Sequence, residues 1–162
     1  MKRLFFCALL VAILVLGTAV PAMAADKQNF VAHLSGGEEV SPAETLAQGQ
    51  VIFQLSKSGD ELGYRFIAAN IENVMMSHIH LAPAGVNGPV VVWLYPSQPP
   101  AQLITGRFSG VLAEGTITAA NLVGPLAGMA LSDLIAALES GTAYVNVHTT
   151  AYPGGEIRGQ IR

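Results

Sequence analysis

Alternation of apolar and polar residues is the main pattern along the chain from about residue 29 onward. In Gly49–Leu55 every second side chain from Val51 on is apolar, as in a strand with one buried face, because successive strand side chains point to opposite faces. Glu61–Ala69 repeats the alternation, and the polar segment Ser56–Asp60 between the two runs indicates a turn, so the pair predicts a β-hairpin. The same pattern predicts six further strands: Asn29–Ser35, Met75–His80, Val90–Tyr95, Arg107–Thr118, Tyr144–His148 and Glu156–Ile161.

One segment has a helical period instead. In Leu131–Leu138 the apolar residues recur at spacings of three and four, with Ser132 as the expected N-cap and Gly141 as the expected left-handed stop. Many short strands with frequent glycine and proline, plus one short helix, predict a single all-β domain. We expect an antiparallel β-sandwich or Greek-key fold.

The first 24 residues predict an export signal. Lys2 and Arg3 precede the uncharged run Leu4–Val20, and Ala22-Met23-Ala24 is the small-x-small pattern that a signal peptidase cleaves. We therefore expect residues 1–24 to be a signal peptide and residues 25–162 to form the domain, exported to the periplasm or secreted. The alternative is a retained anchor, because about 17 apolar residues can just span a bilayer; after cleavage no membrane span is expected.

Composition narrows the function classes. The chain has 162 residues, 51% of them hydrophobic and only 12% charged, which excludes a disordered protein. Its net charge of −3 argues against a nucleic-acid partner, which usually selects a basic surface. The only cysteine, Cys7, lies within the expected signal, so the domain has neither disulfides nor thiolate metal ligands.

Histidines carry the clearest candidate chemistry. His78 and His80 are two residues apart and therefore share one face of a strand, with Ile79 turned toward the core. His148 lies on the outward face of its own predicted strand by the same alternation. If these two strands are neighbours, three imidazoles converge, because cross-strand pairs lie about 4.5–5.5 Å apart.

Three converging imidazoles suit a metal ion, with copper favoured and zinc the weaker choice. His33 is a further candidate ligand, and so is Met76, since thioether and imidazole together favour copper. The competing interpretation is structural: the histidines are hydrogen-bonded side chains, and Met76 fills the core. The sequence leaves both interpretations open.

Several segments together resemble one family. They are Phe30–Val40, His78-Ile79-His80 with the Gly-Val-Asn-Gly-Pro-Val loop, Gly141–Thr149, and the closing Pro153–Gln160. These motifs, in this order, are similar to those of the CHRD domain, first named from chordin and found in exported microbial proteins. The resemblance implies an immunoglobulin- or superoxide-dismutase-like sandwich and an extracellular binding module. It also implies that His78, His80 and His148 occupy the family's own histidine positions.

Three functions follow as alternatives. The first is an exported binding protein with a copper site at the histidines. The second is a metal-free interaction or adhesion module, whose partner is an extracellular protein or a carbohydrate. The third and weakest is a superoxide-dismutase-like or cupin-like metalloenzyme: the loop after His80 lacks a cupin carboxylate, and the domain has too few histidines for a dismutase. We therefore expect a protein that is not an enzyme.

Overall fold

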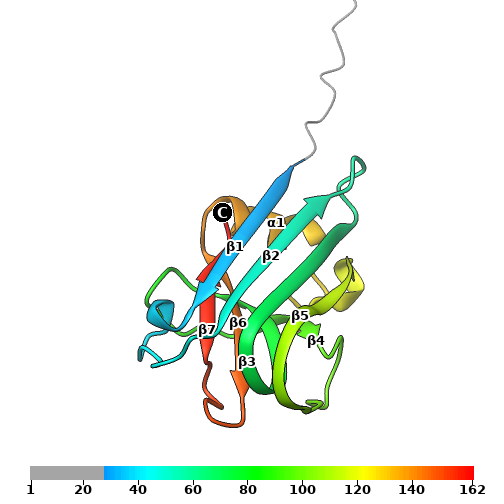
Figure 1. The fold of residues 1–162 in the computed structure, drawn as a ribbon. Coiled ribbons are helices and arrows are strands. Elements are labelled where there is room, and N and C mark those ends of the chain that lie inside the picture. The colour runs from blue at the N-terminus through cyan, green and yellow to red at the C-terminus, as the bar shows by residue number, and fades with distance from the viewer. Residues whose placement is uncertain (1–27) are drawn as a thin grey trace, which may run out of the picture.

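The computed structural model describes residues 28–162, so the predicted signal peptide with Cys7 lies outside the described residues. The described chain contains seven strands, one α-helix and three short 3₁₀ segments (Figure 1). The strands are β1 (Asn29–Ser35), β2 (Gln48–Leu55), β3 (Leu62–Leu81), β4 (Val90–Tyr95), β5 (Ile104–Ile117), β6 (Ala143–Thr149) and β7 (Ile157–Gln160); the helix is α1 (Leu131–Glu139).

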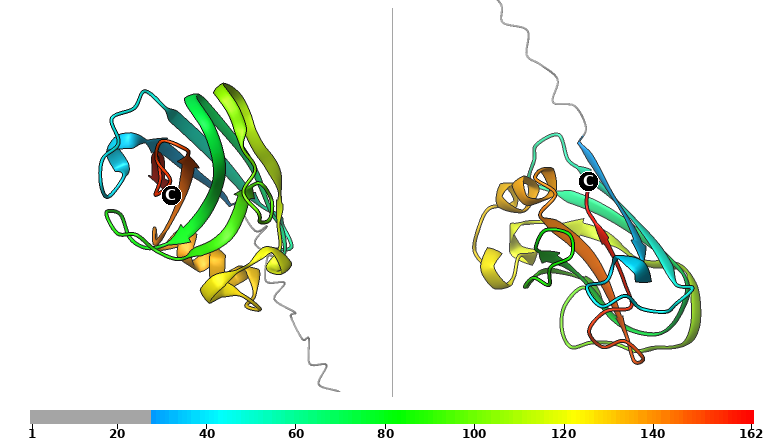
Figure 2. Two further views of the ribbon diagram at one scale, coloured as in Figure 1. Left: turned by 90° about the horizontal axis from the view of Figure 1, so that it is seen from below. Right: turned by 90° about the vertical axis from the view of Figure 1, so that its left-hand side faces the viewer.

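All seven strands belong to one antiparallel sheet that curls on itself. Five of them close into a barrel in the order β2-β1-β7-β6-β3, because β2 also pairs with β3. Strands β4 and β5 both pair with β3. Figure 2 shows the barrel curving around its interior, with α1 and the segment before it gathered near one end.

Strand β3 is unusually long and pairs with four other strands. Its first half pairs with β2 and β5, and its last residues pair with β6 and β4. Between the halves, Asn70 and Asn73 have positive φ angles of 56° and 52°. Asparagine tolerates this left-handed conformation better than most residues, so the strand turns here from one set of partners to the other.

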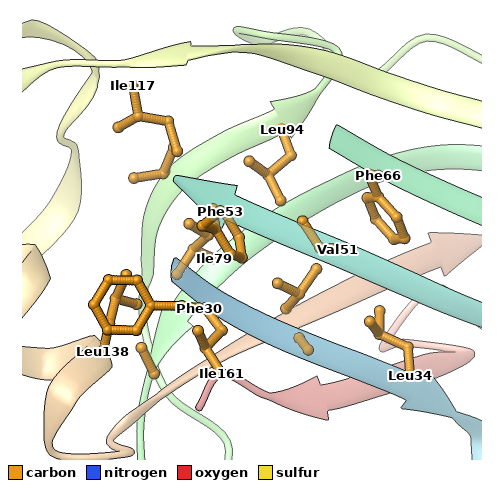
Figure 3. Packing of buried hydrophobic residues seen from close by; sticks show 14 of the residues in the cluster. Phe30, Leu34, Val51, Phe53, Phe66, Ile79, Leu94, Ile117, Leu138 and Ile161 are labelled. Atoms are coloured by element: carbon orange, nitrogen blue, oxygen red, sulfur yellow. The ribbon is translucent and has the colours of Figure 1, made fainter. Parts of the chain in front are cut away.

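The barrel interior is apolar. Alternate side chains of the barrel strands, such as Val51, Phe66 and Ile79, are fully buried and pack together (Figure 3). Val145 of β6 belongs to the same cluster. Helix α1 adds its buried leucine and isoleucine side chains to the same cluster. This interior accounts for one face of each strand; the opposite face of β3 and β6 carries the candidate site.

The predicted elements largely correspond to those observed. An all-β, antiparallel fold with one helix is confirmed; the finer sandwich or Greek-key arrangement stays a prediction. The helix begins one residue before the expected cap: Ala130 is the N-cap, and its N–H donates to the Asp133 carboxylate at 3.1 Å, so the Ser132 prediction was wrong. Gly141 does adopt the left-handed conformation, with φ 66°. Within residues 28–162, no helix has the length and apolar character needed to cross a membrane.

Candidate metal centre

The outer face of β3 and β6 carries the predicted histidines. The two strands are antiparallel neighbours, and their register sets Met76 opposite His148 and His80 opposite Tyr144. Ile79 points into the barrel and is fully buried, so His78 and His80 lie on the outside of the barrel wall, as their spacing predicted.

This outer face is nevertheless shielded from water. His78, His80 and His148 are only 2%, 7% and 6% exposed. Residues of the loops after β3 and β6 lie over the cluster: the Gly88 carbonyl contacts His80, and the Pro153 carbonyl contacts His148. The loops therefore turn a barrel surface into an enclosed polar layer.

The three imidazoles converge. Ring centroids are 5.2 Å apart for His78 and His148, 5.6 Å for His78 and His80, and 5.9 Å for His80 and His148. One nitrogen from each ring lies within 4.8 Å of the other two. His78 Nδ1 is 3.3 Å from His148 Nε2. Two ligands of one tetrahedral ion, each about 2.0–2.1 Å from it, would be separated by about the same distance.

The backbone fixes which nitrogen carries the proton. His80 Nδ1 is 2.9 Å from the Gly88 carbonyl oxygen, and His148 Nδ1 is 3.0 Å from that of Pro153. A carbonyl only accepts, so each Nδ1–H donates and each Nε2 keeps a lone pair. A backbone carbonyl behind the imidazole is the usual support of a metal-ligating histidine.

Two ring nitrogens lack any partner. The buried Nε2 atoms of His78 and His80 make no hydrogen bond. Buried polar atoms are nearly always paired, so unpartnered nitrogens on two of the three clustered rings call for an explanation. A metal ion held between His78 Nδ1 and His148 Nε2 with His80 Nε2 as the third ligand would give the His80 nitrogen its missing partner; the donor set therefore fits zinc or copper.

The site keeps its imidazoles neutral. Burial, helped by the neighbouring His148 and His80, lowers the pKa of His78 to about 3. Burial lowers the pKa of His80 to about 4, with His148 and Arg158 acting in the same direction against the Gly88 hydrogen bond. Burial also lowers the pKa of His148. Neutral imidazoles are the form that binds metal ions.

Aromatic residues line the cluster. Trp93 on β4 meets the His78 ring edge-on at 4.2 Å between centroids, and Tyr144 stacks on His80 at 4.9 Å and 9°. The Tyr144 hydroxyl accepts from the Gly88 N–H at 3.1 Å. These contacts hold the rings of His78 and His80 in place. The His-x-His spacing in the sequence does not indicate these aromatic contacts.

A buried ion pair lies behind Tyr144. Arg158 Nε donates to Glu39 Oε2 at 2.8 Å, and both side chains are 5% exposed. Glu156, two residues before Arg158, is also buried, and it accepts hydrogen bonds from Thr45 and Thr149 rather than pairing with the arginine. The pairing of Glu39 with Arg158 was missed, because their 119-residue separation leaves no local pattern.

The two additional candidate ligands lie differently. His33 is exposed on β1, pairs in register with Gln50 of β2, and is not among the clustered histidines. Met76 is partly buried and lies directly across from His148. Its role as a ligand stays a prediction.

Comparison with known proteins agrees with the motifs. The family model for the CHRD domain matches residues 30–161, nearly the whole of the described chain. No match was found among curated proteins or among solved structures. The matched range includes all three clustered histidines, both covering loops and the Glu39–Arg158 pair, and it shows that the chain belongs to the CHRD domain family.

Proposed function

We propose that this protein is an exported CHRD-domain protein that binds one metal ion through His78, His80 and His148. The observation that carries the proposal is the convergence of three buried imidazoles, with His78 Nδ1 3.3 Å from His148 Nε2 and the buried Nε2 of His80 without a hydrogen-bond partner. One nitrogen from each ring lies within 4.8 Å of the other two. The role is binding; no catalytic step is assigned to the site.

Copper is the favoured ion and zinc the weaker candidate. The cluster consists of imidazoles alone, with no carboxylate or thiolate among the described ligand atoms. Nitrogen sites generally bind copper more tightly than zinc. Met76, opposite His148 in register, would add a soft thioether next to the imidazoles.

Trp93 provides a local test. It is the only tryptophan of the chain, and its ring lies 4.2 Å from His78. Cu(II) at the cluster should quench the fluorescence of Trp93 with a one-to-one end point, because a bound paramagnetic ion next to the indole quenches its excited state. We expect the quenching to disappear in the His78→Ala, His80→Ala double variant and to persist in His33→Ala, a matched surface control. Full quenching in the double variant would rule out this site.

A metal-free interaction module is the second candidate. It is favoured by the three hydrogen bonds that hold the rings without an ion: His78 to His148, His80 to Gly88, and His148 to Pro153. Its partner would be an extracellular protein or a carbohydrate. An intact wild-type fold that binds neither copper nor zinc would favour this function.

Export is a separate part of the proposal. It is supported by the charged start, apolar run and Ala22-Met23-Ala24 of the sequence. Expression of the full chain followed by intact-mass analysis tests it. A product beginning at Ala25 outside the cytoplasm is expected, and a full-length product within the cell would contradict it.

A further inference from the structure

A buried cation lies one aromatic ring away from the candidate metal centre. The Arg158 guanidinium carbon is 4.3 Å from the centre of the Tyr144 ring. The same Tyr144 ring stacks with that of His80 at 4.9 Å between centroids. The remaining nitrogens of the guanidinium donate to the Val86 carbonyl at 3.2 Å and to Asn87 Oδ1 at 2.6 Å. Arg158 is therefore held in place and removed from water.

The charges around the cluster are unfavourable to a highly charged ion. All three ligands are neutral imidazoles, and none of the clustered groups is an acid. An ion that enters the site loses most of its hydration, and the cost of burying a charge rises steeply with that charge. The guanidinium adds repulsion that acts twice as strongly on a divalent ion as on a monovalent one.

We infer that the site selects a monovalent soft ion, Cu(I), over divalent ions, and that Arg158 is the residue that strengthens this selectivity. The inference rests on the proposed metal site and names the ion that it takes. Imidazole is a copper ligand, and Met76, opposite His148 in register, would add the soft thioether that favours Cu(I).

Glu39 moderates the repulsion from Arg158. Its carboxylate pairs with Arg158, and this pairing lowers the pKa of Glu39. Burial raises that pKa by more, so keeping the carboxylate charged in this position costs free energy. Removal of the Glu39 carboxylate should leave the guanidinium less neutralised and weaken the binding of a divalent ion relative to Cu(I). Removal of the Arg158 guanidinium should strengthen the binding of a divalent ion relative to Cu(I). The two substitutions are expected to change ion selectivity with opposite signs.

The test compares two ions across matched variants. Dissociation constants for Cu(I), held under reducing and anaerobic conditions, and for Zn(II) are measured by chelator competition near neutral pH. The variants are Arg158→Gln, Arg158→Lys, Glu39→Gln and the surface control Arg65→Gln. Arg65 forms an exposed pair with Glu114 on the β3–β5 surface, with side chains 62% and 66% exposed. Circular dichroism confirms that each variant is folded.

The ratio of the two affinities is the readout. The two stacking distances bring Arg158 within about 9 Å of His80; at an effective dielectric constant of about 20 an unpaired charge there disfavours one additional ionic charge by about twentyfold. Because Glu39 cancels part of this, we expect Arg158→Gln to reduce the Cu(I) preference by about threefold to twentyfold. Glu39→Gln should increase it, and Arg158→Lys and Arg65→Gln should leave it near wild type.

A purely structural role for Arg158 predicts a different result. Loss of packing would weaken both ions alike and leave their ratio unchanged, and that outcome would overturn the inference. Zinc bound as tightly as Cu(I) by the wild type would also overturn it, while leaving the metal site intact. Binding of neither ion would overturn the proposed function itself. Should Arg158→Gln not fold, the opposite shift in Glu39→Gln decides the matter.

Discussion

The metal-free protein should lose stability as the pH falls from 7.5 to 5.5, because its buried histidines resist protonation. The pKa of His78 is lowered to about 3 and that of His80 to about 4, chiefly by burial. In the unfolded chain both return to about 6.5, so in this window the unfolded state takes up protons that the native state does not. Linkage gives a loss of about 1.4 kcal/mol per histidine, or about 3 kcal/mol for the two.

His148 adds to this loss, since its pKa is also lowered by burial. A loss of this size is a large part of the roughly 5–15 kcal/mol that stabilises a typical domain. Stability contributed by a depressed histidine pKa is fully present above about pH 6.5 and falls as the pH drops toward the native pKa values. The effect therefore has a definite sign: acid weakens the fold.

Urea unfolding followed by circular dichroism, in the presence of a chelator, measures the effect at both pH values. His78→Phe removes one titrating group while keeping a ring beside Trp93, and its loss of stability should be smaller by about 1.4 kcal/mol. His33→Gln, which alters an exposed histidine outside the cluster, should behave like wild type. Any contribution from Glu39 is common to all three proteins. Equal stability of the wild type at the two pH values would refute the reasoning.

Three further perturbations test the packing around the site. Gly88→Ala should cost about 1–3 kcal/mol in thermal unfolding, since its Cβ would overlap the carbonyl of the last residue of β3, whereas Gly154→Ala, in open space, should stay within about 0.5 kcal/mol. Leu134→Ala, fully buried in α1, should cost about 2–5 kcal/mol, and a smaller loss would mean that the helix packs loosely. Arg158→Met alone should cost about 3–5 kcal/mol in urea unfolding, and adding Glu39→Met should recover part of it; additive losses would show that the two side chains do not act as a pair.

The strands were predictable because one face of each is buried in the barrel. Alternation identified β1 and β4 with the observed bounds and β2 within a residue. It divided β3 into two strands, because Asn70 and Asn73 interrupt the pattern where the strand changes partners. The order in which strands pair was not predictable, since closure of the barrel depends on contacts between residues far apart in the chain.

The histidine cluster was partly predictable. Two-residue spacing set the faces of His78, His80 and His148, but their convergence required β3 and β6 to be neighbours, which only the fold decides. Burial of the cluster and the position of Arg158 depend on the covering loops. Their Gly- and Pro-rich composition indicates turns without indicating what they cover.

Elemental analysis of the protein, loaded with excess copper and then desalted, shows whether His78, His80 and His148 hold one metal ion. The His78→Ala, His80→Ala double variant and His33→Ala are prepared in parallel. We expect about one copper per chain in the wild type and in His33→Ala, and none above background in the double variant. The same copper content in all three proteins, or none in the wild type, would contradict this expectation.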